Sequence, residues 1–168
     1  PASNQALPKQ MKANICSGYN FNNPLSTLSM NDNVPLPQIT LPTQVMIQVL
    51  YASVNPGDYM YIKGIYKNAP FKPEPIFPCP LGIDGIGRVV AVGNAVKNFH
   101  LGELVMGVHA NVTHGTFAHY AIFEESELAS VPQSLFDSLS ASILGSVPLV
   151  FLTAFKAFAS YAKLTPFL

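Results

Sequence analysis

The chain has 168 residues, of which 49% are hydrophobic and 11% are charged, and its nine basic and nine acidic side chains cancel. This length fits one domain with a sizeable core. Zero net charge and a single arginine, Arg88, exclude the basic stripe that nucleic acids and acidic membrane surfaces require. Globular proteins usually carry about 25% charged residues. The low value here predicts a surface partly covered by another domain or by a second copy in a homodimer.

The first half of the chain predicts strands separated by loops. Residues 1–10 are polar and predict a loose tail without a signal peptide. A first strand is expected within 11–19, and the proline-rich stretch 20–42 supports only loops and short edge strands. The run VMIQVLYASV at 45–54 is apolar on both faces, which predicts a buried strand. A helical turn is expected to start at Gly57-Asp58.

The second half adds strands and then helices. After a stiff, proline-rich connection, strands are expected over 87–93, 103–108 and 115–125. Ser134 and Asp137 match a capping box ahead of a helix, and another helix is predicted to begin near Pro148. The apolar segment 143–159 is slightly short for a bilayer and contains Lys156, so a buried helix is predicted rather than a membrane span.

Two features of the sequence have simple structural interpretations. Cys16 and Cys79 show neither CxxC nor metal spacing, which predicts buried or half-buried thiols in a reducing compartment such as the cytoplasm. The GIDGIG run at 82–87 lacks the preceding strand and following helix of a dinucleotide fingerprint. We therefore expect its glycines to serve close backbone packing and a bulge.

The motifs VNPGD (54–58), GIDGIG (82–87) and GELVMG (102–107) follow one another in an order that resembles the N-terminal catalytic domain of the medium-chain dehydrogenase/reductase superfamily. Within it, they resemble the zinc-independent quinone oxidoreductases, which are zeta-crystallin-like. The resemblance implies a mostly β, partly open GroES-like barrel over 11–145, with a helix at 146–168 leading towards a nucleotide-binding domain. That Rossmann domain would need on the order of 100–150 further residues. We therefore expect it to be absent, and the chain alone to turn over weakly or not at all.

In full-length members of this family, NADPH or NADH reduces a quinone or an α,β-unsaturated carbonyl. The resemblance places Asn55 and Asp58 at the nicotinamide end of the cleft as candidate catalytic residues. There they would hydrogen-bond the cofactor ribose, which makes Asn55 a cofactor-binding candidate too, or the substrate or an ordered water, although both also suit a local turn. Tyr66 matches a tyrosine near the substrate, where a phenol can donate a hydrogen bond or a proton, or simply form a wall. Thr153 would lie beside the nicotinamide carboxamide, or bond back within its helix.

No catalytic zinc is expected. In zinc-dependent members of the superfamily a cysteine aligns with Asn55 and a histidine with Ile83, and neither residue present here is a zinc ligand. The three histidines at five-residue spacing, His109, His114 and His119, fall on one face of neither a helix nor a strand. They are expected to be structural or surface residues.

Two other functions stay open. The NPGD-to-GIY spacing also suits an enoyl-thioester reductase. Alternatively, the barrel is a non-enzymatic interaction protein whose helix at 148–162 presents Phe151, Phe155 and Phe158 to a partner or dimer mate.

Overall fold

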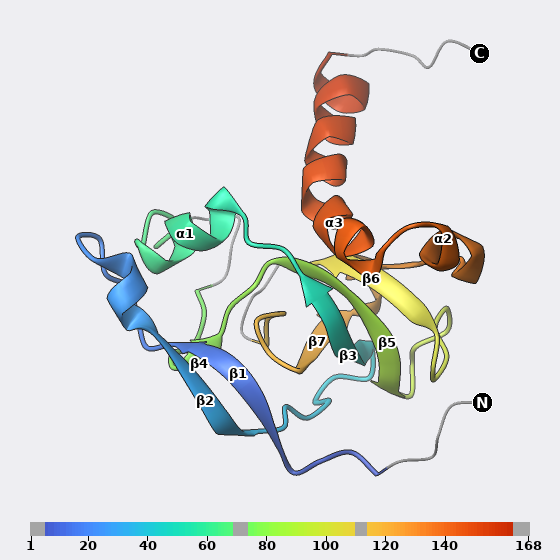
Figure 1. Cartoon of the computed structure of the whole chain (residues 1–168), viewed down its shortest axis with the longest axis horizontal. Coiled ribbons are helices and arrows are strands. Elements are labelled where there is room, and N and C mark those ends of the chain that lie inside the picture. The colour runs from blue at the N-terminus through green and yellow to red at the C-terminus, as the bar shows by residue number, and fades with distance from the viewer. Residues whose placement is uncertain (1–5, 69–73, 110–113, 163–168) are drawn as a thin grey trace.

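The structure, a computed structural model, describes residues 6–68, 74–109 and 114–162. In these ranges, eight strands form two antiparallel sheets that curl into a partly open barrel, with helices at its rim (Figure 1). The strands are β1 (Gln10–Cys16), β2 (Leu28–Pro35), β3 (Gln44–Ala52), β4 (Cys79–Pro80), β5 (Asp84–Val92), β6 (Leu104–Val108), β7 (Tyr120–Glu124) and β8 (Leu128–Ser130). The helices are α1 (Pro56–Ile62), α2 (Gln133–Ser138) and α3 (Ala141–Lys156), with short turns η1 (Pro24–Thr27), η2 (Glu125–Glu127) and η3 (Ala157–Tyr161).

The main sheet has five strands in the order β7-β3-β5-β6-β8. Its inner face carries β-branched and aromatic side chains that form a closed core, namely Val45, Ile47, Val89, Val105 and Phe123. The smaller sheet, β2-β1-β4, joins it where the Asn14 amide donates to the Phe117 carbonyl at 2.8 Å. The expected mostly β, partly open barrel is confirmed, and so are its strands near 11–19, 45–54, 87–93, 103–108 and 115–125.

The GIDGIG run lies at the start of β5, beside β3. A Cβ on Gly85 would sit 2.7 Å from the Tyr51 carbonyl oxygen, and one on Gly82, whose φ is +106°, would sit 2.6 Å from the Phe117 amide nitrogen. Side chains at these positions would push the neighbouring backbone segments apart. The β3–β5 register also shifts between Val49 and Tyr51, as a bulge requires. The packing interpretation of these glycines is confirmed.

Helix α3 starts earlier than the sequence suggested. It begins at Ala141, because the Ser140 hydroxyl accepts the Ile143 amide at 3.4 Å and caps it, so Pro148 lies inside the helix and the start predicted near Pro148 is wrong. The capping box predicted at Ser134 and Asp137 is also wrong. Both residues lie within α2, whose N-cap is Pro132, and the Asp137 carboxylate accepts from the Gln133 side chain at 2.8 Å.

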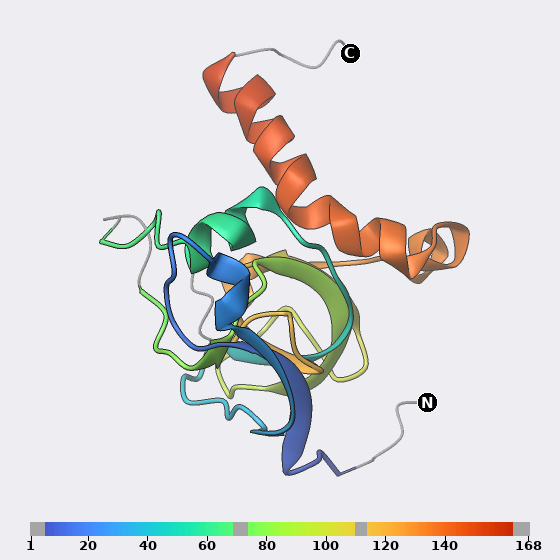
Figure 2. The same ribbon diagram turned by 60° about the vertical axis from the view of Figure 1, so that its left-hand side comes forward.

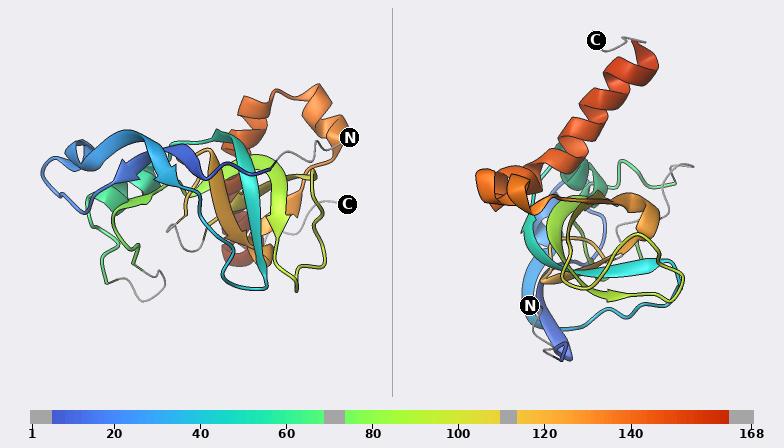
Figure 3. Two further views of the ribbon diagram at one scale, coloured as in Figure 1. Left: turned by 90° about the horizontal axis from the view of Figure 1, so that it is seen from below. Right: turned by 90° about the vertical axis from the view of Figure 1, so that its right-hand side faces the viewer.

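The prediction of a buried helix over 143–159 is wrong as well. Only Leu144, Gly145 and Pro148 of α3 are buried, because the first turns pack on the sheet and the rest projects beyond it (Figures 2 and 3). By length and composition the segment Ala141–Ser160, with a mean hydropathy of 1.7, could cross a membrane. A helix that packs against a second domain meets the same test.

The predicted bounds of the tail and of the domain can be compared with the structure. Residues 1–5 of the tail lie outside the described residues, and Gln10 already belongs to β1. The boundary expected between residues 145 and 146 falls inside α3. Both cysteines are buried and free, as expected, and they face each other across β1 and β4.

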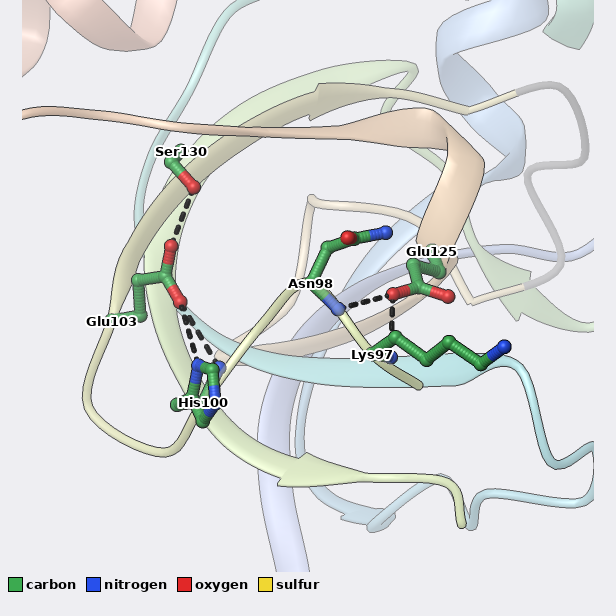
Figure 4. A network of polar contacts seen from close by, with 6 residues as sticks. All are labelled: Lys97, Asn98, His100, Glu103, Glu125 and Ser130. Carbon is green, nitrogen blue, oxygen red and sulfur yellow. Dashed lines mark hydrogen bonds and ion pairs between the residues drawn. The ribbon is translucent and has the colours of Figure 1, made fainter. Parts of the chain in front are cut away.

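Two partly exposed carboxylates fix the β5–β6 loop at the end of the sheet away from α3 (Figure 4). One Glu125 oxygen accepts the Lys97 and Asn98 amides at 2.8 and 2.7 Å, and these bonds hold the pKa of Glu125 below its usual value. Glu103 accepts from the His100 amide at 3.0 Å and from the Ser130 hydroxyl.

Candidate functional site

The loop from β3 to α1 is held by buried polar side chains. Asn55 is the N-cap of α1, and its amide donates to the Asp58 carboxylate at 2.8 Å, half of a capping box. The second Asp58 oxygen accepts the Ile83 amide at 3.1 Å. The Asn55 side chain donates to Ser53 Oγ and to Asp84 Oδ1, both at 2.9 Å. The motif therefore joins α1 to the start of β5.

Burial changes the ionisation of this cluster. The pKa of Asp58 is raised to about 6, chiefly by burial and to a smaller extent by the nearby Asp84 carboxylate, while the two backbone amide bonds oppose the change. Burial likewise raises the pKa of Tyr61 to about 12, with smaller contributions from Tyr19, Tyr66 and Asp58. Near neutral pH Asp58 therefore changes between a neutral acid and a carboxylate.

A cavity of about 420 Å³ opens above this cluster. It is lined by α1, the loop that follows it, the β5 and β6 ends and α3, through Gly57, Tyr66, Ile83, Val108, His109, Leu149, Leu152, Thr153 and Lys156. The structure thus brings together two of the predicted site residues, Tyr66 and Thr153. Among the described residues that line this cavity none is acidic, and its basic side chains are those of His109 and Lys156.

The other two predicted site residues lie behind the wall. Asn55 and Asp58 are only 6% and 5% exposed. They do not line the cavity, but they hold Gly57 and Ile83, which do. Their direct contact with a cofactor, a substrate or an ordered water stays a prediction, and the role visible in the structure is support of the cavity wall.

Tyr66 follows α1 on the rim of the cavity. Its hydroxyl donates to the Met60 sulfur at 3.3 Å, and its ring meets the edge of Tyr61 with centroids 5.2 Å apart. A thioether is a weak acceptor. A ligand oxygen is a stronger acceptor and would compete for this hydroxyl.

His109 was expected to be structural or superficial, yet it lines the cavity. It is 3% exposed and stacks on Phe123 with ring centroids 3.7 Å apart. Its Nδ1 lies 3.8 Å from a Glu127 carboxylate oxygen. The available sequence signal was its position directly after β6, where a strand ends at the cavity. Asp84 and Lys156 were also missed, and Asp84 lay within a motif that we interpreted through its glycines alone.

The donor set does not suit zinc. Ile83 brings an aliphatic side chain to the cavity, and the amide nitrogen of Asn55 already donates two hydrogen bonds. Across the described parts of the chain, no three His, Cys, Asp or Glu side chains gather closely enough to hold a metal ion. Of the three spaced histidines, His109 is buried and His119 is exposed.

A second cavity of about 440 Å³ lies on the other side of Val108 and Leu152. It is mostly apolar and lies between β6, the η2–β8 segment and α3, with Met106, Phe151 and Phe155 in its walls. Glu127 lines this second cavity, and its partner His109 lines the first. The two cavities therefore adjoin at the His109–Glu127 pair.

Comparison with known proteins identifies the family. The alcohol dehydrogenase GroES-like domain matches residues 41–133. The chain is 33% identical over 131 residues to the chloroplast envelope quinone oxidoreductase homolog of Arabidopsis thaliana, covering 76% of this chain and 38% of that protein. It is 34% identical over 124 residues to the human mitochondrial enoyl-(acyl-carrier-protein) reductase, covering 74% and 30%.

A solved structure shows the same relationship. The quinone oxidoreductase from Coxiella burnetii superposes with a TM-score of 0.72 at 27% identity, covering 93% of this chain and 46% of that one. The chain thus spans less than half the length of these proteins. The polar loop on β3, the glycines of β5 and the matched barrel together show that this chain belongs to the alcohol dehydrogenase GroES-like domain family, within the medium-chain dehydrogenase/reductase superfamily.

Proposed function

We propose that this chain forms the substrate side of a zinc-independent, NAD(P)H-dependent reductase of quinones or α,β-unsaturated carbonyls. The observation that carries the proposal is the cavity that brings Tyr66 and Thr153 together beside His109 and Lys156. Its volume of about 420 Å³ lies within the usual range for small-molecule sites. Relatives named as a quinone oxidoreductase homolog and as an NADPH-dependent alkenal/one oxidoreductase support this substrate class.

The chemistry of the wall suits a substrate oxygen that gains negative charge. NADPH, when bound, would supply a hydride, and the reduced substrate then needs one proton at its oxygen or at the carbon next to the carbonyl. The Tyr66 hydroxyl and the Lys156 ammonium can donate hydrogen bonds to that oxygen. Thr153, a turn before the end of α3, would orient the nicotinamide side. Apolar Ile83 and Leu149 would exclude water from the reacting atoms.

Binding of an unreduced substrate tests this proposal. Duroquinone is a suitable probe because all its ring carbons are substituted, so thiols add to it poorly. Replacing Tyr66→Phe removes one hydrogen-bond donor and should weaken duroquinone binding roughly fivefold in calorimetry. The matched control is Tyr59→Phe, a 45% exposed tyrosine on α1 that does not line the cavity. Equal effects of the two substitutions, or no binding at all, would reject the substrate site.

An enoyl-thioester reductase is the second candidate, favoured by the relatives named enoyl-(acyl-carrier-protein) reductase. Crotonyl-pantetheine distinguishes it from the first, because its thioester tail must fit the cavity. Tighter binding of crotonyl-pantetheine than of duroquinone, with the same loss in Tyr66→Phe, would favour this candidate.

The cytoplasm stays our proposed location, supported by the two free and buried thiols. Relatives carry names that place them in chloroplasts and mitochondria, which makes an organelle the alternative. Cell fractionation with a tagged full-length protein separates the two locations.

A further inference from the structure

The carboxylate of Asp84 is completely buried, with 0% of the residue exposed. Both of its oxygens accept hydrogen bonds. Oδ1 accepts from the Ser53 hydroxyl at 2.5 Å and the Asn55 amide at 2.9 Å, and Oδ2 accepts from the Leu149 backbone amide at 2.9 Å. In the described ranges no basic side chain forms an ion pair with it. A buried carboxylate held by hydrogen bonds alone is costly to keep, which raises the question of what it does.

The donors of these bonds come from two separate walls of the cavity. Asn55 caps α1, which carries the lining residue Gly57. Leu149 belongs to α3 and lines the cavity itself, as do Leu152 and Thr153 one turn further along. The backbone of Asp84 is fixed in β5, where its carbonyl accepts the Thr116 hydroxyl at 2.8 Å.

The bond to Leu149 lies where α3 leaves the barrel. Before it, the helix is held by packing, since Leu144 and Pro148 are buried and a Cβ on Gly145 would lie 2.7 Å from Tyr51. After it, the residues of α3 are exposed. The Asp84–Leu149 bond therefore fixes the position and tilt of the helix at the point that determines where Thr153 lies.

We propose that Asp84 is a positioning residue that holds α1, through Asn55, and α3, through the Leu149 amide, at a fixed separation across the cavity. The consequence is geometric. A small displacement of α3 about Leu149 changes the distance between Thr153 and Tyr66, and sites of this kind are sensitive to displacements on the order of 1 Å. This inference rests on the proposed function for its effect on ligands, but its structural part stands alone.

The structural part is tested by amide hydrogen exchange followed by NMR. In the unmodified chain the Leu149 amide should be more protected than those of Leu152 and Thr153, which follow it in the same helix. In Asp84→Asn, an amide side chain keeps the shape but offers one accepting atom instead of two. Either Leu149 loses its acceptor, and its exchange accelerates roughly tenfold or more relative to Leu144, or the Asn55 side-chain amide signals shift instead.

The matched control is Thr116→Val, which removes the bond to the Asp84 backbone and leaves the carboxylate untouched. It should change the exchange of Leu149 and Leu144 equally. Duroquinone binding should weaken at least about fivefold in Asp84→Asn, beyond any change in Thr116→Val.

The outcomes are distinguishable. Fast exchange of Leu149 in the unmodified chain overturns the proposal even if Asp84→Asn fails to fold. So does an Asp84→Asn effect that matches the control at every amide and in ligand affinity. If duroquinone does not bind the unmodified chain, the proposed function fails, while the exchange comparison still decides the role of Asp84.

Discussion

Asn55 and Asp58 show how a motif residue can serve a site without touching its ligand. Both side chains use their polar atoms within the protein, on the α1 N-terminus, on Ile83 and on Asp84. The sequence offered two interpretations, a ligand contact and local turn chemistry. The structure supports a third interpretation, because the hydrogen bonds of these two residues extend to β5 and support the cavity wall.

The raised pKa of Asp58 predicts a specific pH dependence of stability. Because its folded-state pKa is about 6 and its ordinary value is 3.8, its contribution to stability is full below about pH 4 and is lost as the pH rises to about 6. Relative to Asp58→Asn, which does not titrate, the free energy of unfolding should fall by about 2 kcal/mol over this interval. Urea unfolding at several pH values measures it.

An exposed carboxylate provides the control for that series. The side chain of Asp32 is 71% exposed, so Asp32→Asn should change the pH profile by less than about 0.5 kcal/mol. A difference between the unmodified chain and Asp58→Asn that stays constant from pH 4 to pH 6 would mean that Asp58 is already ionised in the folded protein.

Residue roles were harder to predict than residue positions. Tyr66 and Thr153 were expected at the site, and both line its cavity. His109 was missed because a five-residue spacing carries information only within one helix or strand, whereas His109 reaches the cavity as β6 ends. Asp84 was missed because its three hydrogen-bond donors lie 29, 31 and 65 positions away in the sequence. They belong to a loop and a helix whose paths the sequence did not reveal.

At the scale of elements, the close approach of β3 and β5 predicts a large cost for a side chain at Gly85. Its Cβ would meet the rigid Tyr51 carbonyl at 2.7 Å, so Gly85→Ala should lower the free energy of unfolding by about 1–3 kcal/mol or more. Gly57→Ala is the control, because its Cβ would meet only the flexible end of Ile83 at 2.9 Å. Thermal and urea unfolding should separate the two variants, and equal losses would contradict the packing argument.

The strands were predictable and the start of α3 was not, for a physical reason. Alternating or continuous apolar runs between turn residues indicate strands within a few positions. Pro148, however, is compatible with the first turn of a helix, and we therefore predicted that the helix begins near it. The N-cap at Ser140 determines the true start, and the tertiary bond from Leu149 to Asp84 shows how the turn around the proline is held.

At the scale of the whole molecule, the cavity exists only because distant segments meet. The loop after α1, the ends of β5 and β6, and α3 supply its walls from positions 57 to 156. Family motifs identified the loop, and apolar runs identified the strands. The burial of α3 depends on what lies against its outer face, and neither its apolar composition nor its length specifies that neighbour.

The outer half of α3, together with the η3 turn that follows it, leads to the last prediction. Phe151, Phe155 and Phe158 are 65%, 57% and 59% exposed, so the barrel gains little from them. Replacing all three with glutamine should change the free energy of unfolding by less than about 1 kcal/mol, whereas Leu144→Ala, at a residue only 2% exposed, should cost about 2–5 kcal/mol. Urea unfolding at low protein concentration, where self-association is minimal, makes this comparison.

Sedimentation of the same triple variant decides what the exposed phenylalanines do. If they form an interface between copies, the unmodified chain should sediment as a stable oligomer and the triple variant as a monomer. This result, together with failure of the unmodified chain to bind duroquinone or crotonyl-pantetheine, would favour the interaction-protein interpretation. If both sediment as monomers and the unmodified chain binds a probe, the face is free to pack against a further domain, as a reductase requires. A triple variant as unstable as Leu144→Ala would show instead that the outer half of α3 packs on the barrel in solution, because exposed side chains cannot contribute so much to folding.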